Sequence, residues 1–210
     1  TAVVTVRLND DGGTVGGGVN VSSPQTFTIQ ISAGGYSLPG DLDTTFDGEG
    51  QKFIGSPFGS FDVARDVVQQ NDGKYVVVGT YDNGTSAVSA AARFNADGSL
   101  DASFGTGGFG RLAAANGVYA VKQQTDGKIV IGGYSSTSAY VARLNIDGSF
   151  DSSFASSGVF TNTLTNTITT SSLTTGLALQ ADGKIVLTKY LRPSGSTVNS
   201  VVVARLTTAG

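Results

Sequence analysis

Hydrophobic and polar residues alternate along most of this chain in short runs, which are separated by clusters of Gly, Asp, Asn and Ser. Such alternation predicts β-strands that bury one face, and the clusters predict the turns between them. The clearest runs come in consecutive pairs of predicted strands, at residues 63–70 and 75–78, 118–124 and 129–131, and 173–180 and 185–187. The pattern therefore predicts an antiparallel all-β protein built from short strands.

An Asp-Gly pair separates the two strands of each predicted hairpin, with its glycine at Gly73, Gly127 and Gly183. Asp-Gly is a favoured pair for a type I′ turn, in which both central residues have positive φ. We therefore expect three type I′ hairpins.

Three phrases recur in the same order along the chain. In each unit Leu-Asp-x-x-Phe, or its Phe-Asp-x-x-Phe variant, is followed by Gln-x-Asp-Gly-Lys and then by Ala-Arg-Phe/Leu, and the Asp-Gly-Lys phrases recur at spacings of 54 and 56 residues. A period of this length is typical of a propeller, solenoid or array. The phrases predict three repeat units within residues 35–210, at about 41–98, 99–148 and 149–210.

Residues 1–34 lack the repeat, but they contain two alternating segments, at residues 3–8 and 26–31. Two such segments joined by a Gly-rich stretch predict a β-hairpin. This hairpin resembles the end of the cadherin-like or immunoglobulin-like domains of large bacterial surface proteins. Because two strands rarely fold alone in water, we expect residues 1–34 to contact a neighbouring module.

The repeats resemble the delta-sixty repeat family of bacterial secreted and surface proteins. The segments NADGSLDASFGTGG, QQTDGKIVIGG and VARLNIDGSFDSSF carry the resemblance. It implies a propeller-like fold and no defined activity. The expected fold is a propeller-like array of three antiparallel repeat units plus an N-terminal β-hairpin. Three units cannot close a ring, because propellers typically have about four to eight blades.

Composition excludes several classes of function. The chain has no Cys and no His. A cysteine or serine nucleophile paired with histidine therefore cannot be assembled, and most transition-metal sites lose their usual ligands. A net charge of −3, with basic residues scattered singly, argues against nucleic acid as a partner. No apolar run is long enough for membrane insertion. The chain starts at Thr1 and contains no Met, which indicates a processed or excised piece.

Calcium is the one cofactor that the sequence suggests. Oxygen-bearing side chains stand at every second position in two turns, as at the start of an EF-hand loop. These candidate metal ligands are Asn95, Asp97, Ser99 and Asp101, and Asn145, Asp147, Ser149 and Asp151. The glycine and the bidentate glutamate that complete such a loop are missing. The alternative is a turn that Asp stabilises by accepting backbone N–H bonds, with no cofactor.

Two further sets of residues repeat with the units. Tyr81, Tyr134 and Tyr190 follow the second strands and are candidate platforms for sugar rings, although tyrosine also serves ordinary strand packing. Basic residues also repeat, at Arg93, Arg143 and Arg205 and at Lys74, Lys128 and Lys184. A structural role is expected for them, in which a bidentate arginine pairs with the Leu-Asp aspartate and locks one unit to its neighbour. The alternative is that these side chains anchor a ligand. No pair of carboxylates is marked out for catalysis.

Together these features predict a non-enzymatic structural or adhesive repeat module of a bacterial extracellular or surface protein. Its unpaired strand edges favour self-association into a fibre or larger propeller, or contact with neighbouring modules of a longer chain. The alternative is a glycan-binding or glycan-cleaving β-propeller, whose partners would be cell-surface glycans.

Overall fold

The structure of the 210-residue chain is a computed structural model. It describes residues 2–6, 25–29, 40–53, 63–82, 87–162, 169–193, 197–198 and 200–210. Contacts divide the chain into two compact units, Thr1–Leu42 and Asp43–Gly210. Each unit is described by itself below.

The first unit contains the predicted N-terminal hairpin. Strand β1 (Ala2–Val6) pairs antiparallel with β2 (Gln25–Ile29), and the register runs from Ala2 opposite Ile29 to Val6 opposite Gln25. The pairing of the two alternating segments is therefore confirmed. The Gly-rich connection between them, and residues 7–8 and 30–31 of the predicted strands, lie outside the described residues.

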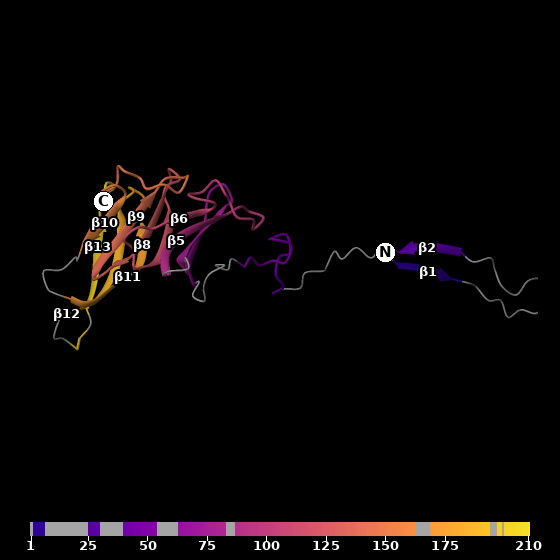
Figure 1. The fold of residues 1–210 in the computed structure, drawn as a ribbon, viewed down its shortest axis with the longest axis horizontal. Coiled ribbons are helices and arrows are strands. Elements are labelled where there is room, and N and C mark those ends of the chain that lie inside the picture. The colour runs from indigo at the N-terminus through magenta and orange to yellow at the C-terminus, as the bar shows by residue number, and fades with distance from the viewer. Residues whose placement is uncertain are drawn as a thin grey trace, which may run out of the picture. The chain divides into compact units, whose positions relative to one another are not determined.

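The second unit contains three antiparallel sheets, which Figure 1 shows side by side in chain order. The first sheet is β3 (Val63–Gln69), β4 (Tyr75–Asp82), β5 (Ala87–Phe94) and β6 (Phe109–Arg111). The second is β7 (Gly117–Gln123), β8 (Ile129–Ser135), β9 (Ser138–Leu144) and β10 (Val159–Asn162). The third is β11 (Thr169–Leu179), β12 (Ile185–Pro193) and β13 (Ser200–Leu206). The all-β, propeller-like array is confirmed.

The hairpin turns differ from the predicted type I′ geometry. Only the glycine of each Asp-Gly pair has positive φ, for example 86° at Gly127, and Asp126 does not. Gly127 N–H donates to the carbonyl of Gln124, and Gln124 N–H donates to that of Lys128. This pattern fits a three-residue loop, in which an ordinary turn is followed by a left-handed glycine. The Asp126 carboxylate accepts the Lys128 N–H, which fixes the loop without a left-handed aspartate.

Two hydrophobic cores lie between consecutive sheets. One joins the first and second sheets and includes Val76, Val78, Val121 and Ile131. The other joins the second and third sheets and includes Val130, Val141, Phe154, Leu177, Ile185 and Leu187. Each sheet therefore buries a face against its neighbour, as stacked repeats do.

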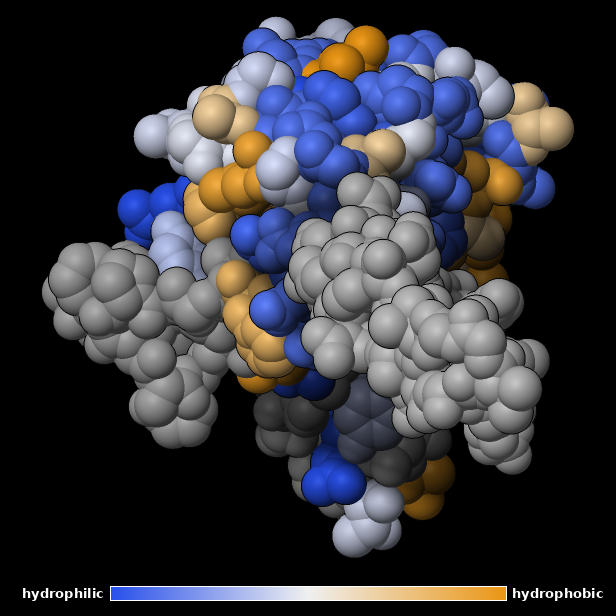
Figure 2. Space-filling model, turned by 90° about the vertical axis from the view of Figure 1, so that its right-hand side faces the viewer, coloured by the Kyte–Doolittle hydropathy of each residue, from blue (hydrophilic) through white to orange (hydrophobic). Residues whose placement is uncertain are grey.

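The face of the molecule in Figure 2 is largely hydrophilic over its upper part, and its hydrophobic residues form small separate patches. Among the residues described, no helix has the length and apolar character that crossing a membrane requires. Most of the buried apolar side chains of this array pack between its sheets.

Candidate functional site

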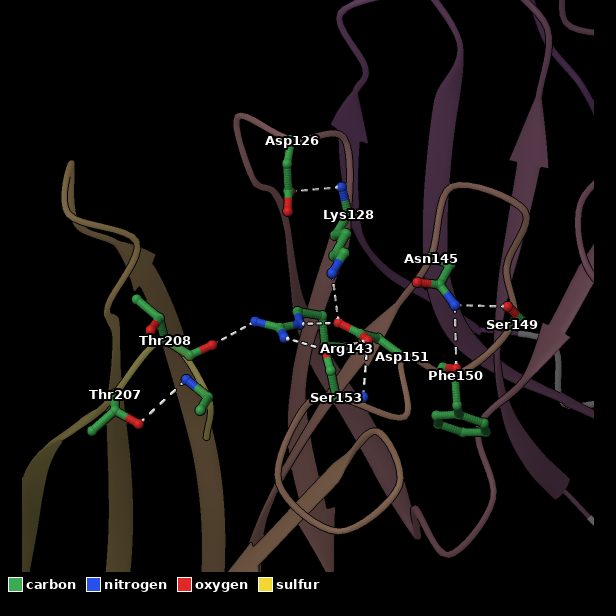
Figure 3. A network of polar contacts seen from close by, with 11 residues as sticks. Asp126, Lys128, Arg143, Asn145, Ser149, Phe150, Asp151, Ser153, Thr207 and Thr208 are labelled. Carbon is green, nitrogen blue, oxygen red and sulfur yellow. Dashed lines mark hydrogen bonds and ion pairs between the residues drawn. The ribbon is translucent and has the colours of Figure 1, made fainter.

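A network of polar contacts lies where the second sheet meets the third, around Arg143 (Figure 3). Arg143 stands on β9, and the guanidinium Nε donates to Asp151 Oδ2 at 2.6 Å. Lys128, from the start of the neighbouring strand, donates to the same oxygen at 2.9 Å. Ser153 donates both its N–H and its hydroxyl to Asp151 Oδ1. One carboxylate therefore receives four donors.

The same arginine also reaches across to the third sheet. Arg143 Nη1 donates to the carbonyl of Thr208 at 2.6 Å, just beyond the end of β13. The backbone N–H of Ala155 donates to the carbonyl of Ala209 at 2.6 Å. The Arg143 guanidinium lies 4.6 Å from the centre of the Phe154 ring. The Asp-x-x-Phe loop is thus bound to its own sheet by charge and to the next sheet by backbone contacts.

The first sheet repeats this arrangement. Arg93 Nε and Lys74 Nζ both lie 2.7 Å from Asp101 Oδ2. Arg93 also donates to the carbonyl of Ile146 in the second sheet and stands over the Phe104 ring. The predicted pairing of arginine with the Leu-Asp aspartate is therefore confirmed for the first two copies, but it runs through the single Nε–Oδ2 contact and is not bidentate. The lysine of each turn joins the same oxygen. We call each set of Arg, Lys, Asp and the following Ser and Phe a junction.

The junctions hold their carboxylates ionised. Hydrogen bonds from Lys74 and Ser103 place the pKa of Asp101 far below its ordinary value. Burial acts to raise the pKa of Asp151, but the hydrogen bonds from Ser153, Lys128 and Arg143 outweigh it, so this pKa also lies far below the ordinary range. The charged pairs are buried, since Arg143 is 7% exposed and Asp151 is 5% exposed. A carboxylate that stays ionised at neutral pH and accepts several hydrogen bonds suits a structural role better than proton transfer.

The candidate calcium ligands are bonded to protein groups in the structure. Asp97 Oδ1 accepts the N–H and the hydroxyl of Ser99, and Asp147 Oδ1 accepts the same two donors of Ser149. Asn95 and Asn145 turn their amide nitrogens toward the Ser99 and Ser149 hydroxyls. In the part of the chain that the structure describes, no group of three or more carboxylates converges as metal ligands would.

The three candidate glycan-platform tyrosines are half-buried and lie on different sheets. Tyr81 lies 5.9 Å from the Phe109 ring, within the first sheet. Tyr134 stacks on Tyr119 at 6.0 Å, within the second sheet, and burial raises the pKa of the Tyr134 phenol. Tyr190 is on β12 of the third sheet. The structure therefore does not bring the three side chains together on one sheet.

A shallow depression of about 340 Å³ lies between two Asp-Gly turns of the second sheet. It is lined by Asp126, Lys128, Asn145, Ile146 and Asp147. The ammonium of Lys128 is already paired with Asp151, and the carbonyl of Ile146 already accepts Arg93. These groups support the adjoining junctions.

Two parts of the junctions were missed by sequence reasoning. The carbonyls of Ile146 and Thr208 accept the arginines across the sheet boundary, and a backbone acceptor leaves no mark in a sequence. Ser103 and Ser153 bridge aspartate and arginine, and their repeated spacing of two residues after the aspartate could have identified them.

Comparison with known families agrees with this description. Residues 70–104 and 124–154 match a family described as "Domain of unknown function (DUF5122) beta-propeller". Each matched segment begins at the glutamine before Asp-Gly-Lys and ends at the phenylalanine of the Asp-x-x-Phe loop, so each spans one complete junction. No curated protein and no solved structure matches the chain.

Proposed function

We propose that this chain is a non-enzymatic structural or adhesive repeat module of a bacterial extracellular or surface protein. The observation that carries the proposal is the use of its repeated ionisable residues. In both complete junctions the arginine and the lysine pair with the aspartate, and the arginine also donates to a backbone carbonyl of the next sheet. Because these repeated charged side chains pair with one another inside the fold, they support a role in building the array.

The finer family assignments belong to this proposal. The repeat phrases fit the delta-sixty family of surface and secreted proteins, and the β1–β2 hairpin fits the end of a cadherin-like or immunoglobulin-like domain. On this view, the array spaces or links modules at the cell surface, and the loops between the second and third strands of each sheet make contacts outside it.

Surface display of the full 210-residue chain on a host bacterium tests the proposal. We expect displaying cells to aggregate or to adhere to surfaces more strongly than cells with an empty display protein. Cells displaying Asp151→Ala, in which a junction is broken, should lose the effect if the folded array is needed. Surface staining of each strain controls for the amount displayed.

A parallel measurement addresses enzymatic activity. The purified chain is incubated with a panel of chromogenic glycosides, and its binding to a glycan array is measured. We expect neither turnover nor binding. Turnover that survives purification and is abolished by an Asp→Asn substitution would contradict the non-enzymatic assignment.

A further inference from the structure

The outer face of the third sheet exposes side chains that the second sheet buries. Val201 and Val203 on β13 are 76% and 67% exposed. Counted from the Ala-Arg-Leu phrase, their equivalents on β9 are Ala139 and Val141, and both are 0% exposed. Ala139 and Val141 belong to the core between the second and third sheets. The third sheet thus presents an apolar surface of the kind that joins two sheets elsewhere in the molecule.

The same face carries two cations of an incomplete junction. Arg205 and Lys184 are the equivalents of Arg143 and Lys128. Arg205 is exposed, and among the described residues it forms no hydrogen bond or ion pair. Lys184 is 40% exposed and pairs at 2.5 Å only with Asp182, two residues away on its own turn. We call the set of Arg205, Lys184, Val201 and Val203 the socket. It has the cations of a junction but lacks the Asp-x-x-Phe loop.

The opposite end of the array has the loop without the cations. Asp43 Oδ1 accepts the N–H and hydroxyl of Thr45, just as Asp151 Oδ1 accepts those of Ser153. The N–H of Asp47 donates to the carbonyl of Asp97 at 2.7 Å, as that of Ala155 donates to the carbonyl of Ala209. The loop of residues 43–50 is therefore already docked on the first sheet in the junction geometry.

An apolar surface accompanies this loop. Val67 on β3 is 56% exposed, whereas its equivalent on β7, Val121, is 0% exposed within the core between the first two sheets. The Asp43 carboxylate is exposed, and no lysine or arginine of the described residues pairs with it. The two ends of the array are thus complementary in charge, and both offer surfaces that the interior sheets bury.

We propose that the socket binds the Asp43 loop of a second copy of this chain, so that copies associate head to tail. The carboxylate of Asp43 takes the place that Asp151 holds between Arg143 and Lys128, and the Val67 face covers Val201 and Val203. A second copy fits because it brings the loop and the apolar face together, in the arrangement that the molecule builds twice internally. Such a contact is heterologous and propagates into a fibre or closes into a ring. This inference deepens the proposed structural role and rests on it.

Charge exchange at the two ends tests the contact with the full 210-residue chain. We expect the average mass of the unmodified protein, measured by sedimentation equilibrium, to rise with concentration. Asp43→Arg and Arg205→Asp should each weaken self-association at least tenfold. An equimolar mixture of the two variants should regain association, because the Asp43→Arg variant retains an intact socket and the Arg205→Asp variant an intact loop. Asp126→Arg carries the same change of charge in an exposed turn of the second sheet, between the two ends of the array, and should associate like the unmodified chain.

Two outcomes would overturn the proposal. One is an unmodified chain that stays monomeric at every concentration; in that case a melting temperature that falls on Asp43→Arg would mean that the loop is bound within its own chain. The other is association that neither substitution weakens, which would place the contact on another surface. Neither of these results depends on glycan turnover, so this inference and the proposed function fail separately.

Discussion

The second and third sheets carry the same Ala-Arg-Leu phrase in opposite surroundings. Arg143 is 7% exposed and donates to Asp151 and to the third sheet, whereas Arg205 is exposed. Val141 is fully buried, and Val203 is 67% exposed. The role of a repeated residue therefore depends on the neighbouring sheet as much as on the repeat phrase in which it stands. Substitutions at equivalent positions should therefore have unequal effects.

The largest inequality is expected at the aspartates. Asp151→Ala leaves the Arg143 and Lys128 charges in a mostly buried site without their carboxylate, so the free energy of unfolding should fall by about 3 to 5 kcal/mol. Asp43→Ala, at the equivalent position of the first loop, removes an exposed carboxylate that accepts hydrogen bonds only from Thr45 among the described residues, so the urea midpoint should fall far less. Equal midpoint shifts for the two variants would contradict the comparison.

Acid should act on the same junctions with a smaller effect. The pKa of Asp101 and that of Asp151 are depressed in the folded protein, so their contribution is complete above the unfolded-state pKa, about 4. It is lost as pH falls toward the folded-state pKa, at roughly 2 kcal/mol for each carboxylate. Urea unfolding between pH 7 and pH 2 measures this loss. The curve for Asp151→Asn should fall less steeply below pH 4 than that of the unmodified chain, and a parallel curve would assign acid sensitivity elsewhere.

Val141 and Val203 give the same contrast between a buried and an exposed position without any change of charge. Val141→Ala removes two buried methyl groups between the second and third sheets and should cost about 1.5 to 2 kcal/mol. Val203→Ala, at the equivalent exposed position, should leave the stability of the monomer unchanged. Both are measured by urea unfolding at a protein concentration low enough to suppress association. A cost for Val203→Ala under those conditions would show that its surface is covered within the chain.

The smallest effect is expected between the two complete junctions. Gly105 and Ala155 follow the phenylalanine of each loop, and both are left-handed, with φ of 55° and 43°. A side chain in this conformation is strained, so Ala155→Gly should raise the free energy of unfolding by about 0.5 to 1 kcal/mol. Differential scanning calorimetry measures the shift, and a loss of stability would show that the Ala155 methyl group packs usefully.

Much of the fold could be predicted from sequence because its signals are local. Alternating residues set the strands of each sheet, and Asp-Gly pairs set the hairpin positions. The predicted type I′ turn was wrong because that prediction assumed a two-residue loop. The structure adds one residue, and Asp126 stabilises that loop with its own side chain. Loop length is a property of the strand register, which the turn residues alone do not determine.

The junctions could be predicted only in part. Pairing of arginine with aspartate followed from their repetition, but its extension to the carbonyls of the next sheet depends on how the sheets stack. Lys189 is a second example. It stands where the second sheet has Gly133, and it is fully buried, with a hydrogen bond to the carbonyl of Thr137. Nothing in the local sequence marks that lysine as buried, because this acceptor comes from the second sheet.

A double-mutant cycle tests most directly whether the junctions hold the array together. The cycle combines Arg143→Gln with Asp151→Asn, and a control cycle combines Lys184→Gln with Asp182→Asn at an exposed ion pair, with each free energy of unfolding taken from urea titrations at neutral pH. We expect a coupling of about 1.5 kcal/mol or more for the buried pair and a much weaker coupling for the exposed one. A negligible coupling between Arg143 and Asp151 would contradict the proposed role of the junctions.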